Sequence, residues 1–156
     1  MNWRQRIEPL VRPLLHAWWR ATRGMTLGVR GIVERADGHV VLVRHTYVPG
    51  WHLPGGGVER GEPAALSLSR ELAEEAGIAL DGPARLFGIY SNEKRFRGDH
   101  VLVFVARDWH PCETDHDGEI EAVDWFAPDA LPEGTTPATR RRLAEFAGRA
   151  EVADLW

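Results

Sequence analysis

The chain has 156 residues, of which 44% are hydrophobic and 27% are charged, and its formal net charge is −4 at pH 7. This length suits one domain with its own hydrophobic core, and the composition excludes an intrinsically disordered chain. The negative charge argues against broad nucleic-acid binding through a basic surface, although a local basic pocket for phosphates remains compatible with it.

The single cysteine, Cys112, has no second cysteine with which to form a disulfide within the chain. Small secreted domains commonly depend on disulfides, so we expect a reducing, cytoplasmic compartment. No run approaches the roughly 18 consecutive apolar residues of a membrane-spanning helix. The N-terminus also lacks the apolar stretch and small-residue cleavage site of a signal peptide, so we expect neither a transmembrane segment nor a secretory leader.

Residues 3–22 predict an amphipathic helix, because apolar side chains recur at helical spacing between Ile7 and Trp19 with arginines among them. Pro9 and Pro13 either start this helix or bend it. The helix packs on the core of its own domain, contacts a second copy of the chain in a homodimer, or lies on a membrane surface. We therefore divide the chain into an N-terminal helical extension, residues 1–22, and a main domain, residues 23–156.

Residues 25–34 and 40–45 are rich in β-branched side chains and predict two strands, which the turn between them would join as a hairpin. Arg30 and Arg44 interrupt these apolar strands. Each either faces solvent or contacts a diphosphate, to which a guanidinium can donate paired hydrogen bonds. Trp51, just before a run of glycines, either packs in the core or stacks on the base or sugar of a ligand.

Three consecutive glycines, residues 55–57, lead into a predicted helix that opens at Glu62-Pro63 and closes before Gly77. One stripe of this helix is apolar, while another carries three glutamates. Carboxylates three and four positions apart lie about 5–6 Å from one another and repel by roughly 3 kcal/mol per pair at an effective dielectric of about 20. In a cleft this repulsion favours a bound cation, and carboxylate oxygens suit Mg²⁺. The glutamates are Glu71, Glu74 and Glu75.

Residues 84–90 and 100–107 predict two further strands, separated by a loop at 91–99. The loop contains three basic residues, including Arg95, beside an aromatic one. It either contacts the distal part of an anionic substrate or forms a mobile hairpin tip.

Residues 119–126 end in the alternating pattern of a strand, and residues 137–148 predict a terminal helix. We expect Leu143, Phe146 and Ala147 to face inward. The arginine run at 140–142 is interpreted as a solvated face of this helix.

The spacing around the glycine run resembles the Nudix box, with Gly56, five residues, Glu62, seven residues, and then the segment from Arg70 to Ile78, Arg-Glu-Leu-Ala-Glu-Glu-Ala-Gly-Ile. No specified position departs from the family pattern, and Gly77 is one of them. The resemblance implies a Nudix fold, an α/β/α sandwich with a mixed β-sheet in which the box forms a loop, a helix and a loop. The N-terminal amphipathic helix would be an addition to that fold.

Nudix enzymes typically hydrolyse a nucleoside diphosphate linked to another moiety, by attack of water on a phosphorus atom. By resemblance, Mg²⁺ or Mn²⁺ would be held by Glu71, Glu74 and Glu75, with the Gly55 carbonyl and a glutamate before Trp125 as further ligands. Glu119 is favoured over Glu121 as that glutamate.

The resemblance also implies a supporting role for Arg70, which would pair with the glutamates and orient them, and for Glu62 in the loop. The residue that accepts the proton of the attacking water varies within the family. Glu71, Glu119 and His100 are therefore all left open for that role.

The box does not determine the substrate, which we expect to be a small nucleotide. Our first choice is a pyrophosphatase for ADP-ribose or an NDP-sugar, and the alternatives are a housecleaning enzyme that cleaves nucleoside triphosphates, an enzyme for RNA ends or for coenzyme A substrates, and a non-catalytic nucleotide sensor. A pure sensor has no need of three crowded carboxylates, so the sequence favours hydrolysis. The candidate substrate-binding residues are Arg30, Arg44, Trp51 and Arg95.

Overall fold

The computed structural model describes residues 18, 24–114 and 118–156. The helix expected over residues 3–22 lies outside these ranges except for Trp18. The division of the chain after residue 22, and the choice among the three roles of that helix, therefore stay predictions. No helix in the described part of the chain is long and apolar enough to cross a membrane.

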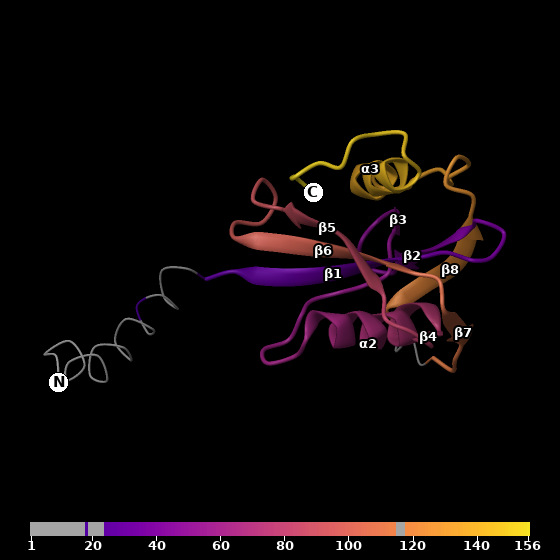
Figure 1. Ribbon diagram of the computed structural model, residues 1–156, viewed down its shortest axis with the longest axis horizontal. Coiled ribbons are helices and arrows are strands. Elements are labelled where there is room, and N and C mark those ends of the chain that lie inside the picture. Colours follow the sequence, from indigo (N-terminus) through magenta and orange to yellow (C-terminus); the bar gives the residue numbers. More distant parts are fainter. Residues whose placement is uncertain (1–17, 19–23, 115–117) are drawn as a thin grey trace, which may run out of the picture.

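The strands lie between two helices, α2 on one side and α3 on the other (Figure 1). In the described residues, one sheet has the order β1-β6-β5, a second has the order β3-β2-β8, and β4 pairs with β7. Strands β1 and β6 run parallel, whereas the other pairs are antiparallel, which confirms the expected α/β sandwich with mixed strand directions. The elements are β1 (Thr26–Val33), β2 (Val40–His45), β3 (Trp51–His52), α2 (Ala64–Ala76), β4 (Ile78–Leu80), β5 (Arg85–Ser91), β6 (Asp99–Ala106), β7 (Trp109–Pro111), β8 (Ile120–Phe126) and α3 (Pro137–Phe146).

The hydrophobic core has two halves, one on each face of the strands. Val29 of β1 packs in the half that contains Leu68 and Leu72 of α2. Ile32 of the same strand packs in the half that contains Leu143 of α3. Because each strand presents successive side chains to opposite faces, a strand covered on both faces must be apolar on both. This explains the nearly continuous apolar runs of β1 and β2.

The strands β1 and β2 and the turn between them are confirmed, since the Arg35 amide donates to His39 O at 2.8 Å, but the two strands do not pair along their length as the predicted hairpin would. The two strands belong to different sheets, and the described residues join them through one antiparallel bridge, between Glu34, one residue past β1, and Val40. One edge of β1 is paired with β6 along its whole length. The other edge is bonded to the glycine run, since the Val29 amide donates to Gly56 O at 2.9 Å and the Gly31 amide to Pro54 O at 2.9 Å. These bonds occupy this edge of β1 as far as Gly31, so β2 does not pair along it.

Helix α2 follows the prediction closely at its end and less closely at its start. Pro63 is its N-cap instead of its first helical residue. Gly77 has a φ of 64°, the left-handed conformation that ends a helix, and its amide donates to the Ala73 carbonyl. The box therefore forms the expected loop and helix.

Helix α3 departs from prediction at two residues. Ala147, expected to face inward, is exposed. Arg142, expected on a solvated face, is completely buried. Arg142 lies three residues after the buried Thr139, on the same stripe of the helix, so the inward face runs through the arginine run.

Candidate active site

The glycine run brings the backbone of the loop against the acidic stripe of α2. An ideal Cβ on Gly56 would lie 2.5 Å from Glu71 Cδ, so only glycine allows this carboxylate to pack on the loop. The amide of Gly55 donates to Glu75 Oε2 at 2.7 Å. The glycines thus position two of the four predicted metal-binding carboxylates, Glu71 and Glu75.

Arg70 contacts three acidic side chains of the box. Its Nη1 lies 2.8 Å from Glu71 Oε1 and 3.2 Å from Glu74 Oε2, and its Nε lies 3.2 Å from Glu62 Oε1. The hydrogen bond from Arg70, with a second one from the Ser67 hydroxyl, lowers the pKa of Glu62 to about 2. The Glu62 carboxylate therefore stays ionised at neutral pH and holds Arg70 beside the helix.

Glu71 and Glu75 are short of positive charge. Burial raises the pKa of Glu75 to about 7, and the nearby carboxylates of Glu71 and Glu119 add to this rise against the opposing Gly55 amide and Arg30. Burial also raises the pKa of Glu71, while Arg70 opposes the rise. Burial and crowding of carboxylates both disfavour their charged forms. A cation placed among these groups would stabilise them.

One cation, the guanidinium of Arg30, already lies beside this cluster. Its Nη1 donates to the carbonyl of Gly55 and, at 3.3 Å, to that of Leu53. Burial lowers the pKa of Arg30, and the negative charges of Glu75 and Glu71 work against this lowering. The Gly55 carbonyl, a predicted metal ligand, therefore accepts from Arg30 in this structure.

The structure also brings His45 to the cluster, which the sequence did not indicate. His45 Nε2 lies 3.5 Å from Glu75 Oε1, within ion-pair range. Burial lowers the pKa of His45, with Arg30 and His52 adding to the effect, so the imidazole is neutral near pH 7 and the pair carries no charge attraction. No local pattern marks His45, because its approach to Glu75 depends on how β2 passes α2.

Among the described residues, no three histidine, cysteine, aspartate or glutamate side chains already converge on one metal position. The donor chemistry nevertheless fits a hard divalent ion, since the cluster offers carboxylate oxygens and has more negative charge than Arg30 and Arg70 balance. Of the two glutamates near β8, Glu121 is occupied by Arg44, with two contacts of 3.0 Å. Glu119 is exposed and close enough to raise the pKa of Glu75, so it is the better placed of the two.

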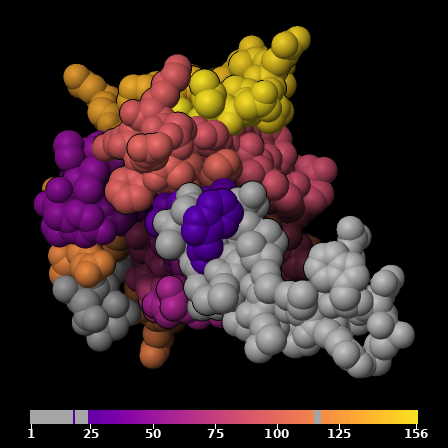
Figure 2. All heavy atoms as spheres, turned by 90° about the vertical axis from the view of Figure 1, so that its left-hand side faces the viewer, coloured from indigo at the N-terminus to yellow at the C-terminus, as the bar shows by residue number. Residues whose placement is uncertain are grey.

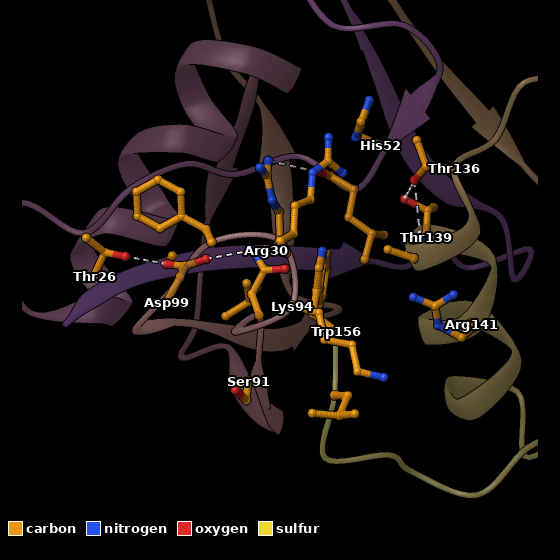
Figure 3. Close-up of a pocket in the computed structure, with 18 of the residues that line it drawn as sticks. Thr26, Arg30, His52, Ser91, Lys94, Asp99, Thr136, Thr139, Arg141 and Trp156 are labelled. Atoms are coloured by element: carbon orange, nitrogen blue, oxygen red, sulfur yellow. Dashed lines mark hydrogen bonds between the residues drawn. The ribbon is translucent and has the colours of Figure 1, made fainter.

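A cavity of about 790 Å³ opens beside the glycine run, and its wall includes Arg30 but none of the predicted glutamate ligands. Its wall is formed by the start of β1, the loop between β5 and β6, the start of α3 and the last residues of the chain (Figure 3). Besides Arg30, three cationic side chains line it, and none of these three has a side-chain hydrogen-bond or ion-pair partner among the described residues. They are Lys94, Arg95 and Arg141.

The acidic residue in the cavity wall, Asp99, forms no ion pair with these cations among the described residues. The Asp99 carboxylate accepts from the Thr26 hydroxyl at 2.7 Å and from the Asn92 amide at 2.8 Å. Arg95 also lies near His52, whose pKa is lowered chiefly by burial, with Arg30 and Arg95 adding to the effect. The cavity is therefore suited to an anion.

Two predicted substrate-binding residues do not reach this cavity. Arg44 pairs with Glu121 and its guanidinium lies 5.1 Å from the centre of the Trp51 ring. Trp51 is buried in the core, where its ring meets Phe126 edge to face at 5.0 Å. His100 of β6 is not part of the cavity wall either. The other two predicted substrate-binding residues, Arg30 and Arg95, do line the cavity.

The fold and the acidic loop-and-helix site define a class of enzymes, the hydrolases of phosphorus-containing anhydrides. The family pattern of the NUDIX domain matches residues 24–146. A "MutT-like protein" of Streptomyces ambofaciens is 34% identical over 120 residues, which cover 77% of this chain and 75% of the relative. A Bacillus subtilis protein named "Putative 8-oxo-dGTP diphosphatase" is 31% identical over 126 residues, which cover 81% and 83%.

Among solved structures, the MutT NUDIX hydrolase from Burkholderia pseudomallei superposes with a TM-score of 0.65 at 31% identity, over 76% of this chain and 95% of the other. The chain belongs to the Nudix hydrolase family. Enzymes of this family generally use divalent metal ions and act on small nucleotide substrates.

Proposed function

We propose that this protein hydrolyses the pyrophosphate bond of a nucleoside diphosphate derivative with Mg²⁺, or Mn²⁺, as its cofactor. One observation supports this most. The glycine run holds two carboxylates in a cluster whose negative charge is incompletely balanced. Glu71 packs against Gly56, and Glu75 accepts a hydrogen bond from the Gly55 amide.

The metal ligands that we infer are all oxygen donors of this cluster. When bound, a divalent ion neutralises charge on the phosphoryl group and lowers the pKa of the attacking water. The Glu119 carboxylate has no side-chain partner among the described residues, whereas Glu71 is bonded to Arg70. Glu119 is therefore the better supported proton acceptor. The inferred ligands are Glu71, Glu74, Glu75 and Glu119, with the Gly55 carbonyl available if Arg30 moves from it.

Arg70 and Glu62 are positioning residues in this proposal. Arg70 holds two of the carboxylates, and Glu62 holds Arg70. Groups that orient metal ligands commonly affect metal affinity or activity by roughly 10- to 100-fold. Arg30 lines the cavity and is also close to Glu71 and Glu75, so its guanidinium can donate to a phosphate in either place.

The cavity favours a nucleoside triphosphate as the substrate. Three cations without partners suit the high negative charge of a triphosphate better than that of ADP-ribose, because phosphates bind to such donors through charge-assisted hydrogen bonds. The B. subtilis relative, whose printed name contains 8-oxo-dGTP, supports the same choice.

ADP-ribose or an NDP-sugar, our first choice from the sequence alone, becomes the second candidate. The observation that favours it is the cavity volume of about 790 Å³, which leaves room for a second sugar. The products separate the two candidates. A nucleoside triphosphate yields a nucleoside monophosphate with inorganic pyrophosphate or, in two steps, phosphate, whereas ADP-ribose yields AMP and ribose 5-phosphate.

A panel of nucleoside triphosphates, ADP-ribose and NDP-sugars, assayed with Mg²⁺ and with EDTA, tests the proposal. We expect Mg²⁺-dependent cleavage that is greatest for a triphosphate. Cleavage that is unchanged in EDTA would contradict the metal-dependent mechanism. Nucleotide binding without any turnover would contradict hydrolysis and favour the sensor.

A further inference from the structure

The last residues of the chain form a short tail, residues 152–156, that lies outside the region matched by the NUDIX domain. The tail runs beside the end of β5, where Leu155 forms a parallel bridge with Ser91. The Ser91 amide donates to Asp154 O at 2.8 Å, and the Trp156 amide donates to Ser91 O at 3.0 Å. Figures 1 and 2 show this yellow segment next to the end of the β5–β6 hairpin. The tail is thus added to a strand of the fold.

A buried ion pair of α3 anchors this tail. Arg142 Nη2 lies 2.5 Å from Glu145 Oε1, and both side chains are nearly inaccessible to solvent. Arg142 Nη1 also donates to Leu155 O at 3.0 Å, and the Ala153 amide donates to Glu145 Oε1 at 3.2 Å. Buried charges are tolerated only where their remaining hydrogen-bonding capacity is satisfied. The tail backbone supplies part of that capacity, which couples its position to the buried pair.

The anchor also fixes the ring of Trp156. This ring meets Tyr90 edge to face at 5.9 Å, and the Arg142 guanidinium lies 5.5 Å from its centre. Tyr90 in turn donates to Glu145 Oε2 at 2.9 Å. Trp156 is only partly buried, and its accessible part lines the cavity, in the same wall as Lys94 and Arg141 (Figure 3).

We propose that Trp156 is the surface on which the base of a nucleotide packs in this cavity. This inference rests on the proposed nucleotide substrate. Arg30 and the glycine run mark the end of the cavity nearest the glutamates, where the reacting phosphates belong. The indole is a flat aromatic surface in a cavity whose wall carries both apolar and cationic side chains, and nucleobases of every kind stack on aromatic side chains. Arg142 and Glu145 act as positioning residues that hold the ring.

The test compares ligands with and without a base. Binding of ADP, GDP, CDP, UDP and inorganic pyrophosphate is measured by titration calorimetry without hydrolysis. For Trp156→Ala, we expect the tightest nucleoside diphosphate to bind roughly tenfold more weakly, while the affinity for inorganic pyrophosphate stays within about twofold because it has no base.

Two further variants separate stacking from a merely structural role. Trp156→Phe keeps an aromatic ring and should recover most of the affinity. Val152→Ala changes an exposed tail residue that is not part of the cavity wall, and should leave the affinities for all five ligands unchanged. Thermal unfolding of each variant shows whether it is folded at the temperature of the titration.

Equal weakening of ADP and inorganic pyrophosphate in folded Trp156→Ala would overturn the inference, as would no weakening or no nucleotide binding by the unaltered protein. The inference and the proposed function can fail separately. Base-dependent binding without hydrolysis would support base packing on Trp156 and contradict the proposed hydrolysis. Mg²⁺-dependent hydrolysis with an unaltered KM in Trp156→Ala would support the proposed hydrolysis and contradict base packing on Trp156.

Discussion

Both helices carry arginine–glutamate pairs, but the two sets are in opposite states of charge balance. In α2, the partly exposed Arg70 is shared among three carboxylates, and the burial-raised pKa values of Glu71 and Glu75 mark charge that it does not satisfy. In α3, Arg142 and Glu145 balance one another in the core. Surplus charge indicates a site for a ligand, whereas balanced and buried charge indicates an anchor.

The largest expected effect is on the surplus charge of α2. Glu75→Gln should lower Mg²⁺-dependent hydrolysis roughly 100-fold or more, because a bound metal commonly contributes several kcal/mol to phosphoryl transfer. Steady-state kinetics across a range of Mg²⁺ concentrations measures the loss. Glu59→Gln is the matched control, since Glu59 is exposed on the loop before α2 and the bonds it forms among the described residues are made by its backbone. Equal rates for the two variants would remove Glu75 from the site.

The next effect is on the balanced pair of α3. Arg142→Met should lower the free energy of unfolding by about 3–5 kcal/mol, because it leaves Glu145 charged and unpaired in the core. Urea denaturation measures the loss. The double variant Arg142→Met/Glu145→Leu should recover part of the stability, since removing both charges abolishes the unpaired one. A double variant less stable than the single one would contradict the assignment of the cost to an unpaired charge.

In contrast to Arg142→Met, Arg70→Met should lower activity strongly and stability only slightly. Hydrolysis should fall by roughly 10- to 100-fold, because Glu71 and Glu74 lose the group that orients them. The free energy of unfolding should change by only about 1 kcal/mol, as expected for a partly exposed ion pair. Kinetics and urea denaturation on one preparation give both numbers. A loss of stability as large as that of Arg142→Met would show that Arg70 also stabilises the fold, and would contradict its assignment as a positioning residue of the site.

The smallest expected effect is a pH dependence at Glu62. Its pKa is lowered from 4.5 to about 2 by Arg70, so its ionised form stabilises the fold fully above about pH 4.5 and this contribution is lost as the pH falls through about 2. The difference in melting temperature between the unaltered protein and Glu62→Gln should therefore shrink between those two pH values. A difference that is constant from pH 5 to pH 2 would contradict an ionised Glu62 bonded to Arg70.

Much of the fold could be predicted locally, because local chemistry governs where elements begin and end. Gly77 ends α2 in the left-handed conformation, and Thr136 caps α3 by accepting from the Thr139 amide. Strand pairing could not be predicted in the same way. The hairpin expected between β1 and β2 failed because β6 and the glycine run, both distant in sequence, use the edges of β1.

The same distinction between local features and long-range contacts holds for the candidate site. The box predicted the acidic stripe, whose members lie on one face of a single helix. It could not indicate that Arg44 would be engaged by Glu121, or that His45 would approach Glu75, since both depend on how separate strands meet. The metal ligands, the homodimer and the cytoplasmic location stay predictions.

By itself, the sequence determined the family, the acidic helix and the glycine run that meets it, because these features depend on spacing within one short segment. The tertiary structure alone decided which charges are left over. Arg142 and Arg141 are neighbours in one arginine run, yet one is buried against Glu145 and the other lines the cavity. Successive helical residues point about 100° apart, so which of them meets the core depends on where the whole helix packs.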